Sequence, residues 1–331
     1  MHIRRFILWL AVLTLGVGTA AAQDTSQAPK GGWAKKYEGK PIAQLLPQSN
    51  QILVAVGGDS VLASVDAGDN WYSLLTEPGA ELRGAFLFDP QNGWVVGSPG
   101  VIVKLEKLPN GMIANRLQNA PPGDLHSIFF RDADHGWIGG AGGALLSTRD
   151  AGRTWSSRTF QVGKESSAES TSQTVRAVTF LSETNGAALF GSNQVIVSDD
   201  GGAQWRPVNF PKGTVLKALT RQGQTLLLGG GRQLTPTLVV AGLWRSDDFG
   251  KSWKALSLGE MYGAVTGVWF ADANAGFIAA RGKVYATRDG GQTWTEVSDG
   301  SVAIEEIAGA DVSIVWGIAN GAVYRYVPPA P

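Results

Sequence analysis

Short apolar stretches recur along the chain, and polar or glycine-containing turns separate them. Four of these stretches share one plan, in which an apolar strand ends in a polar turn and a second apolar strand follows: AFLFDPQNGWVVG (85–97), SIFFRDADHGWIGG (127–140), AVTFLSETNGAALFG (177–191) and GVWFADANAGFIAA (267–280). Further apolar strands flank the tryptophan that comes next, as in ALLST (144–148) and KVYAT (283–287). The pattern predicts four-stranded antiparallel units of about 40 residues, which is the length of a propeller blade.

An eight-residue box, Ser/Thr-x-Asp-x-Gly-x-x-Trp, occurs five times, at 64–71, 148–155, 198–205, 246–253 and 287–294. Its glycine permits a positive φ, and its Asp and Ser/Thr oxygens can accept backbone N–H bonds across the turn. Its tryptophan can fill the space between neighbouring blades. We therefore predict structural roles for Asp66, Gly68, Trp71, Asp150, Gly152, Trp155, Asp200, Gly202, Trp205, Asp248, Gly250, Trp253, Asp289, Gly291 and Trp294.

Seven units begin near Ile42, Arg83, His126, Arg176, Lys217, Thr266 and Glu305. In the second unit LEKLPNGM (105–112) replaces the box, and the seventh has only three strands, which end at Tyr326. The segment GGWAKKYEG (31–39) resembles the end of a box and the strand after it, so residues 33–38 are expected to supply the missing outer strand. This closure removes open sheet edges. The prediction is an all-β, seven-bladed β-propeller of four-stranded antiparallel blades, closed by the mature N-terminal strand.

The domain organisation follows from the two ends of the chain. Arg4 and Arg5, the apolar run 6–18 and the alanines at 20–22 predict a signal peptide over 1–22. A linker over 23–32, one propeller over 33–327 and a Pro-rich tail over 328–331 complete the chain, with surface loops expected at 164–174 and 232–242. We expect a monomer that is periplasmic or otherwise exported, soluble after cleavage and not inserted in a membrane.

Composition excludes several kinds of chemistry. The chain has no Cys, so disulfides, thiolate catalysis and Cys-ligated zinc are excluded. Its formal net charge is zero, which argues against nucleic-acid binding by bulk positive charge. The 3 His are scattered, and the glycine-rich run 138–146 lies between two strands of a blade rather than before a helix. We therefore predict no metal, no cofactor and no catalytic residue.

The boxes match the Asp-box, or bacterial neuraminidase repeat. The fuller unit FFRDADHGWIGGAGGALLSTRDAGRTW (129–155) resembles the photosystem II assembly and stability factor family, and the resemblance extends over about residues 33–327. It implies a seven-bladed propeller that assists assembly of a reaction-centre membrane protein from the lumenal side. Relatives in non-photosynthetic bacteria are envelope proteins.

An Asp-box propeller that binds or hydrolyses carbohydrate is the alternative. Five equivalent box carboxylates spread around a ring cannot converge on one glycosidic bond. Glu260 and Tyr262 are read as a polar turn rather than a sialidase nucleophile pair, and the sialidase start motif is not found. The adjacent pairs Glu305–Glu306 and Asp199–Asp200 are expected to point to opposite faces of extended strands. We therefore predict a protein without enzymatic activity.

Four successive units place a basic residue at the start of the innermost strand: Arg83, His126, Arg176 and Lys217. The equivalent positions of the sixth and seventh units hold Thr266 and Glu305. One interpretation is a solvated set of rim charges that contribute little to stability. The other is a basic sector that docks an acidic segment or a C-terminal carboxylate. The family resemblance also implies an arginine-bearing docking surface. The functional hypothesis is an exported propeller that binds an envelope or membrane protein partner and aids assembly or stability of a membrane protein or complex.

Overall fold

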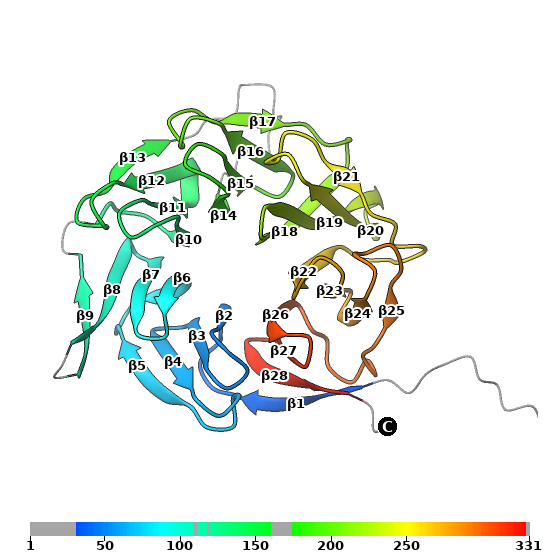
Figure 1. The fold of residues 1–331 in the computed structure, drawn as a ribbon, viewed down its shortest axis with the longest axis horizontal. Coiled ribbons are helices and arrows are strands. Elements are labelled where there is room, and N and C mark those ends of the chain that lie inside the picture. Colours follow the sequence, from blue (N-terminus) through cyan, green and yellow to red (C-terminus); the bar gives the residue numbers. More distant parts are fainter. Residues whose placement is uncertain (1–30, 109–110, 118–119, 160–173, 329–331) are drawn as a thin grey trace, which may run out of the picture.

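The computed structural model describes residues 31–108, 111–117, 120–159 and 174–328. Its 28 strands form seven four-stranded antiparallel sheets, which are arranged as a closed ring of blades (Figure 1). The seven-bladed propeller that the repeats predict is therefore confirmed. The expected signal peptide (1–22) lies outside the described residues, as do 23–30, 164–173 and 329–331 of the expected linker, loop and tail. Within the described ranges, no helix is long and apolar enough to cross a membrane.

In the first four blades, the strands follow chain order from the channel outward. Blade 1 comprises β2 (Gln44–Pro47), β3 (Leu53–Gly57), β4 (Ser60–Ser64) and β5 (Tyr72–Thr76). Blade 2 comprises β6 (Glu81–Asp89), β7 (Asn92–Ser98), β8 (Val101–Leu108) and β9 (Gly111–Arg116). Blade 3 comprises β10 (Leu125–Phe130), β11 (Gly136–Gly140), β12 (Ala144–Thr148) and β13 (Ser156–Thr159), with the 3-10 turn η1 (Ala141–Gly143) between β11 and β12. Blade 4 comprises β14 (Val175–Phe180), β15 (Gly186–Phe190), β16 (Gln194–Ser198) and β17 (Arg206–Val208).

The last three blades complete the ring. Blade 5 comprises β18 (Thr214–Gln222), β19 (Thr225–Thr235), β20 (Leu238–Ser246) and β21 (Lys254–Ala255). Blade 6 comprises β22 (Val265–Phe270), β23 (Gly276–Ala280), β24 (Lys283–Thr287) and β25 (Thr295–Glu296). Blade 7 comprises β26 (Glu306–Asp311), β27 (Ile314–Ala319), β28 (Ala322–Val327) and, outermost, β1 (Gly32–Tyr37). The segment 232–242, which the sequence predicts to lengthen a hairpin of the fifth unit, extends the β19–β20 hairpin, in which Arg232 pairs with Val240.

The ring is closed by β1, which pairs antiparallel with β28. Trp33 lies opposite Tyr326 in this pairing, and their rings are 5.4 Å apart. The Tyr326 hydroxyl donates to the carbonyl of Val297 in blade 6 at 3.2 Å. Strand β1 therefore completes blade 7 and fills part of the seam with blade 6, which confirms the closure predicted for residues 33–38.

The core of the protein is divided among the seams between blades. Seven clusters of buried apolar side chains each join two neighbouring blades, for example Trp94, Val96 and Ile102 of blade 2 with Phe130 and Ile138 of blade 3. Because the faces of each sheet are covered by the next blade, the strands read as continuous apolar runs. The ring is thus held by seven similar interfaces.

The five boxes make the same hydrogen bonds. In each, the Ser/Thr hydroxyl donates to the Asp Oδ1 at 2.8–2.9 Å and accepts the N–H of the box glycine at 2.8–2.9 Å. The Asp Oδ1 also accepts the N–H of the residue four positions later at 2.8–2.9 Å. The box carboxylates are therefore occupied in closing their own turns.

Acidification should weaken the boxes in a defined pH range. Hydrogen bonds, first from the side chain four positions later, lower the pKa values of Asp66, Asp150 and Asp289 from 3.8 to about 2. A depressed pKa in the folded state gives stability that is complete above the unfolded pKa and is lost as the pH falls through the folded value. We expect the melting temperature to fall between about pH 4 and pH 2, and Asp150→Asn to reduce that fall. Thermal melting at successive pH values measures the fall in wild type and its reduction in Asp150→Asn. An Asp150→Asn protein whose melting temperature falls with acid as much as that of wild type would contradict this account.

Candidate functional site

The inner strands of the seven blades enclose a central channel of about 850 Å³. All four basic residues singled out in the sequence line it: Arg83, His126, Arg176 and Lys217. They come from β6, β10, β14 and β18, which follow one another around the ring (Figure 1). The structure therefore brings the four residues to one cavity.

Bulges in the inner strands aim these residues at the channel. The pairing of β6 with β7 shifts between Leu82 and Gly84, so Arg83 is left without a partner in the ladder. Equivalent shifts flank His126, Arg176, Lys217 and Thr266 in blades 3 to 6. A bulge leaves its extra residue unpaired and redirects the side chains around it. Five successive blades thus present one residue each at the same register of the channel.

Arg83 and His126 form a connected group on the wall of blades 2 and 3. Arg83 Nη2 is 3.0 Å from Glu81 Oε2, and Nη1 is 3.3 Å from Asp124 Oδ2. Nη1 also lies 3.0 Å from His126 Nε2, which must accept because the guanidinium only donates. Burial, together with the charge of Arg83, lowers the pKa of His126, so this ring is neutral at pH 7. The basic sector therefore carries its charge on the arginines and the lysine.

Arg176 carries a half-buried charge. Its Nε donates to the carbonyl of Gly191 at 2.8 Å, and its Nη2 donates to the carbonyl of Leu216 in blade 5 at 2.8 Å. Among the described residues no carboxylate forms an ion pair with it, and burial lowers its pKa. Arg176 therefore joins the inner strands of blades 4 and 5. Two Nη1 hydrogens remain available for a ligand.

Lys217 is exposed at the channel rim. In the part of the chain that the structure describes, it forms no ion pair. It is four residues before Arg221, which also lines the channel and donates from Nη1 to the carbonyl of Phe180 at 2.7 Å. The sequence did not single out Arg221, because the repeat aligns only the first residues of the inner strands and Arg221 lies near the end of its strand. The nine residues of β18 carry Arg221 further along the channel wall than the aligned strand starts reach.

Glu305 and Glu306 both line the channel. The N–H of Glu305 donates to the carbonyl of Ile318 at 2.9 Å, and Glu306 pairs with the same Ile318 in the ladder. Two residues thus oppose one, as in a bulge. Burial raises the pKa of Glu306 to about 7. The two carboxyls share one wall and cannot flank a bond from opposite sides as a glycosidase pair must.

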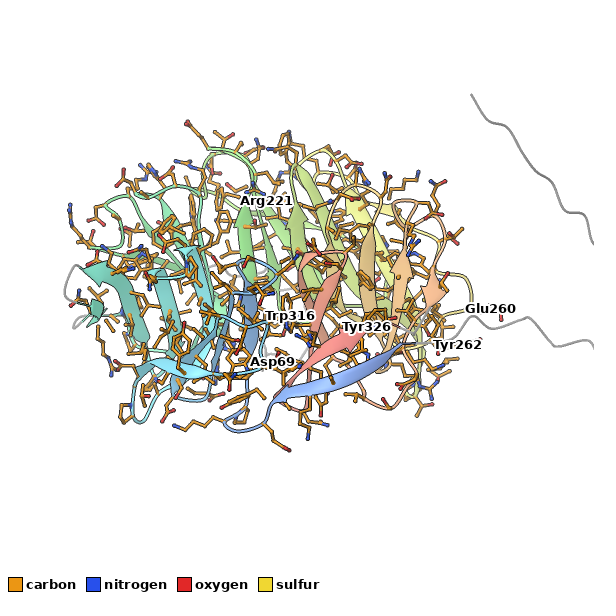
Figure 2. The ribbon with its side chains drawn as sticks, turned by 60° about the horizontal axis from the view of Figure 1, so that its bottom comes forward. Asp69, Arg221, Glu260, Tyr262, Trp316 and Tyr326 are labelled. Carbon is orange, nitrogen blue, oxygen red and sulfur yellow. The ribbon has the colours of Figure 1, made fainter. Side chains whose placement is uncertain are left out.

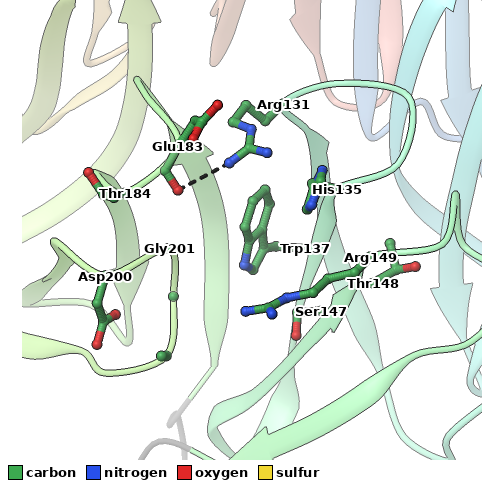
Figure 3. Close-up of a pocket in the computed structure, with 12 residues that line it drawn as sticks. Arg131, His135, Trp137, Ser147, Thr148, Arg149, Glu183, Thr184, Asp200 and Gly201 are labelled. Carbon is green, nitrogen blue, oxygen red and sulfur yellow. Dashed lines mark hydrogen bonds between the residues drawn. The ribbon is translucent and has the colours of Figure 1, made fainter.

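A second pocket, of about 320 Å³, lies at the seam between blades 3 and 4 (Figure 3). Arg131 donates to Asp132 at 2.7 Å and, from Nη1, to the Glu183 carbonyl at 3.1 Å. Nδ1 of His135 is 2.8 Å from Asp132. Box residue Asp200 at the pocket edge accepts bonds from Ser198 and Gln204. Arg131, His135 and Asp200 are thus already engaged in hydrogen bonds, so the channel is the stronger candidate.

The seam between blades 1 and 2 has no box tryptophan, because blade 2 lacks a box. An apolar groove of about 530 Å³ lies there instead. Val65 and Tyr72 on its wall are 56% and 47% exposed. The loss of the box thus has a local structural consequence.

The acid and tyrosine considered in the sequence lie away from the channel. Glu260 and Tyr262 are exposed at the outer edge of the ring (Figure 2). No group of three His, Asp or Glu side chains in the described ranges is arranged to hold a metal ion.

Comparison with known proteins bears on both the fold and the family. The family model described as photosynthesis system II assembly factor YCF48 matches residues 120–210 and 165–324. A solved structure described as YCF48 bound to D1 peptide superposes with a TM-score of 0.69 at 17% identity, covering 95% of this chain and 100% of that chain. YCF48 from Cyanidioschyzon merolae gives 0.68 at 16% identity, covering 89% of this chain and 98% of that one.

The propeller shape is also found in proteins of other kinds. The WD40 β-propeller domain of Doa1 superposes with a TM-score of 0.64 at 11% identity, covering 90% of this chain and 97% of that one. At such identities, structural likeness shows the fold alone. A search of curated proteins finds no match.

Proposed function

This chain belongs to the photosystem II assembly factor family YCF48, and we propose on that premise that it is a non-enzymatic, protein-binding propeller. Its partner is an envelope or membrane protein, and binding aids the assembly or stability of that protein or its complex. The chain is exported by the segment 1–22 and acts as a monomer in the periplasm or an equivalent compartment. The protein acts by holding an acidic segment or a C-terminal carboxylate in the central channel.

The observation that carries this proposal is Arg176. A half-buried guanidinium without a carboxylate partner among the described residues is an incomplete electrostatic arrangement. Its free Nη1 and the ammonium group of Lys217 lie on neighbouring blades of one channel. A carboxylate that enters the channel can accept charge-assisted bonds from both.

The relative whose structure is described as bound to D1 peptide supports a peptide ligand for this fold family. For this chain, the partner is proposed from its own channel chemistry. An extended acidic segment suits this channel, because the basic groups come from successive blades. They are therefore spread along the channel wall and can contact several residues of such a segment. The carbohydrate alternative has less support, because the box carboxylates are bound within their turns and Glu305 and Glu306 share one wall.

Replacement of two channel cations should weaken capture of acidic peptides. We expect the double variant Arg176→Gln, Lys217→Glu to bind an acidic ten-residue peptide with a free C-terminal carboxylate at least about tenfold more weakly than wild type at low salt. Wild-type affinity should itself fall as salt is added, because part of the interaction is exposed. Fluorescence anisotropy with the labelled peptide measures both effects.

The matched control is Arg206→Gln, Lys254→Glu, which makes the same charge change at exposed positions on β17 and β21, the outer strands of blades 4 and 5. Circular dichroism and thermal melting check that each variant is folded. Equal affinity of wild type, control and channel variant at low and high salt would contradict carboxylate capture in the channel. Recovery of the same envelope proteins by wild type and channel variant in a crosslinked pull-down would contradict it independently.

A further inference from the structure

Glu306 introduces an ionisable carboxyl group into a ring of uncharged positions. The residue that follows each bulge position on the inner strands is short or neutral in the other blades: Gln44, Gly84, Ser127, Ala177, Ala218 and Gly267. Five of these six side chains are no larger than serine, and a Cβ added at Gly84 or Gly267 would lie 2.8 or 2.9 Å from backbone atoms of the next blade. This carboxyl is therefore the one titratable group at that level of the channel.

The carboxyl of Glu306 has no cation of its own. Among the described residues it forms neither a hydrogen bond nor an ion pair, and β2, β22, β23 and β27, which pack against its strand, bring no titratable side chain. Glu305 lies beside it. The cationic and titratable groups that share the channel come from other blades: Arg83, His126, Arg176, Lys217 and Arg221.

The environment opposes ionisation of this carboxyl. Burial raises its pKa to about 7 from the usual 4.5. A carboxylate held partly out of water without a partner is unfavourable, and an incoming cation would relieve that energy. A lone carboxylate does not form a metal site, because hard divalent cations require several oxygen ligands.

The position of Glu306 in the ring indicates what kind of cation it can receive. In a seven-bladed ring, blade 7 lies across the channel from blades 3 and 4, and Figure 1 shows β26 opposite β10 and β14. The wall that carries His126 and Arg176 thus lies across the channel from blade 7. Leu46 on blade 1 and Trp269 on blade 6 line the channel on either side of blade 7.

We propose that Glu306 is a specificity residue, which pairs with a lysine or arginine side chain of the same segment whose carboxylate is held by Arg176 and Lys217. This inference rests on the proposed function, because the rim must first hold the segment. The methylene groups of a long basic side chain can pack on Leu46 and Trp269 while its charged end reaches the carboxyl. The channel thereby selects segments that carry both charges rather than purely acidic ones.

The test compares two acidic ten-residue peptides with free C-terminal carboxylates. They are identical except that one carries a lysine near its middle and the other carries norleucine, which has a similar apolar stem and no charge. We expect wild type to bind the lysine peptide about tenfold more tightly. Glu306→Gln should remove that preference while leaving the affinity for the norleucine peptide within about twofold. Glu305→Gln, an exposed neighbour on the same wall, is the matched control and should keep most of the preference.

A second measurement is the release of a proton from Glu306 on peptide binding. The free carboxyl is about half protonated at pH 7, so pairing with lysine should release roughly half a proton per peptide. Isothermal titration calorimetry in buffers of different ionisation enthalpy should detect this release with wild type and the lysine peptide, relative to the norleucine peptide. A change in the protonation of His126 caused by carboxylate binding would be common to both peptides and cancels in that difference. The difference should vanish in Glu306→Gln.

The outcomes separate this inference from the proposed function. Equal affinity of wild type for the two peptides, or a lysine preference that persists in Glu306→Gln, would overturn the inference and leave carboxylate capture intact. Failure of wild type to bind either peptide would overturn both.

Discussion

A protein that lacks residues 23–39 should melt far below the intact chain and self-associate. The deletion removes β1, the outer strand of blade 7, together with the buried ring of Trp33. Loss of a buried tryptophan alone costs about 3–5 kcal/mol, and loss of the strand's hydrogen bonds adds to it. The deletion also leaves β28 as an open sheet edge, which can pair with another molecule.

Thermal melting and size-exclusion chromatography measure these two effects. Deletion of residues 23–30 alone, which retains β1, is the control and should behave as the intact protein does. A peptide of residues 31–39 added to the longer deletion should restore stability by pairing with β28, whereas a scrambled peptide should not. A monomeric deletion protein that melts like wild type would contradict the closure of the ring by β1.

Trp155→Ala should destabilise the protein by about 3 kcal/mol. The ring of Trp155 packs perpendicular to Trp94 of blade 2, at 6.2 Å, and to Phe130 of its own blade, at 5.9 Å. Its indole is half-buried, which places the loss at the lower end of the range for aromatic truncations in cores. Chemical denaturation gives the free energy of unfolding.

Asp150→Asn, in the same box, should lose less stability at pH 7 than Trp155→Ala. The amide retains one acceptor oxygen for Thr148 and for the N–H of Thr154. Neither variant should remove a catalytic activity while it remains folded. A hydrolase activity of the wild type that disappears in folded Asp150→Asn would contradict the structural role of the box.

The repeat determined the architecture of this protein from the sequence alone. Strand alternation and turn chemistry are local, so box glycines such as Gly152, with a φ of 74°, and the Ser/Thr and Asp hydrogen bonds to nearby N–H groups can be expected from eight residues. The inner strands begin within three residues of the predicted unit starts. Closure by β1 could also be predicted, because a three-stranded last unit and an unassigned N-terminal strand complement each other.

The equivalence of the units also predicted that one channel gathers Arg83, His126, Arg176 and Lys217. Repeats that fold alike place their equivalent positions at the same level along the channel. The chemical state of these side chains did not follow from it. The neutral state of His126 depends on burial and on Arg83, and the anchoring of Arg176 depends on Leu216 in the next blade. Packing between blades determines these partners, and the repeat pattern describes single blades only.

The tertiary structure alone showed that both members of the acidic pair, Glu305 and Glu306, line the channel. Alternation along a regular extended strand applies only while the pairing is regular, and here Glu306 pairs with Ile318 while the N–H of Glu305 bonds to the carbonyl of the same residue. A bulge belongs to the pairing of two strands, so one strand's sequence does not specify it. The sequence thus determined the number, order and internal bonding of the blades, whereas the fit between blades determined which charges in the channel are paired and which remain open to a ligand.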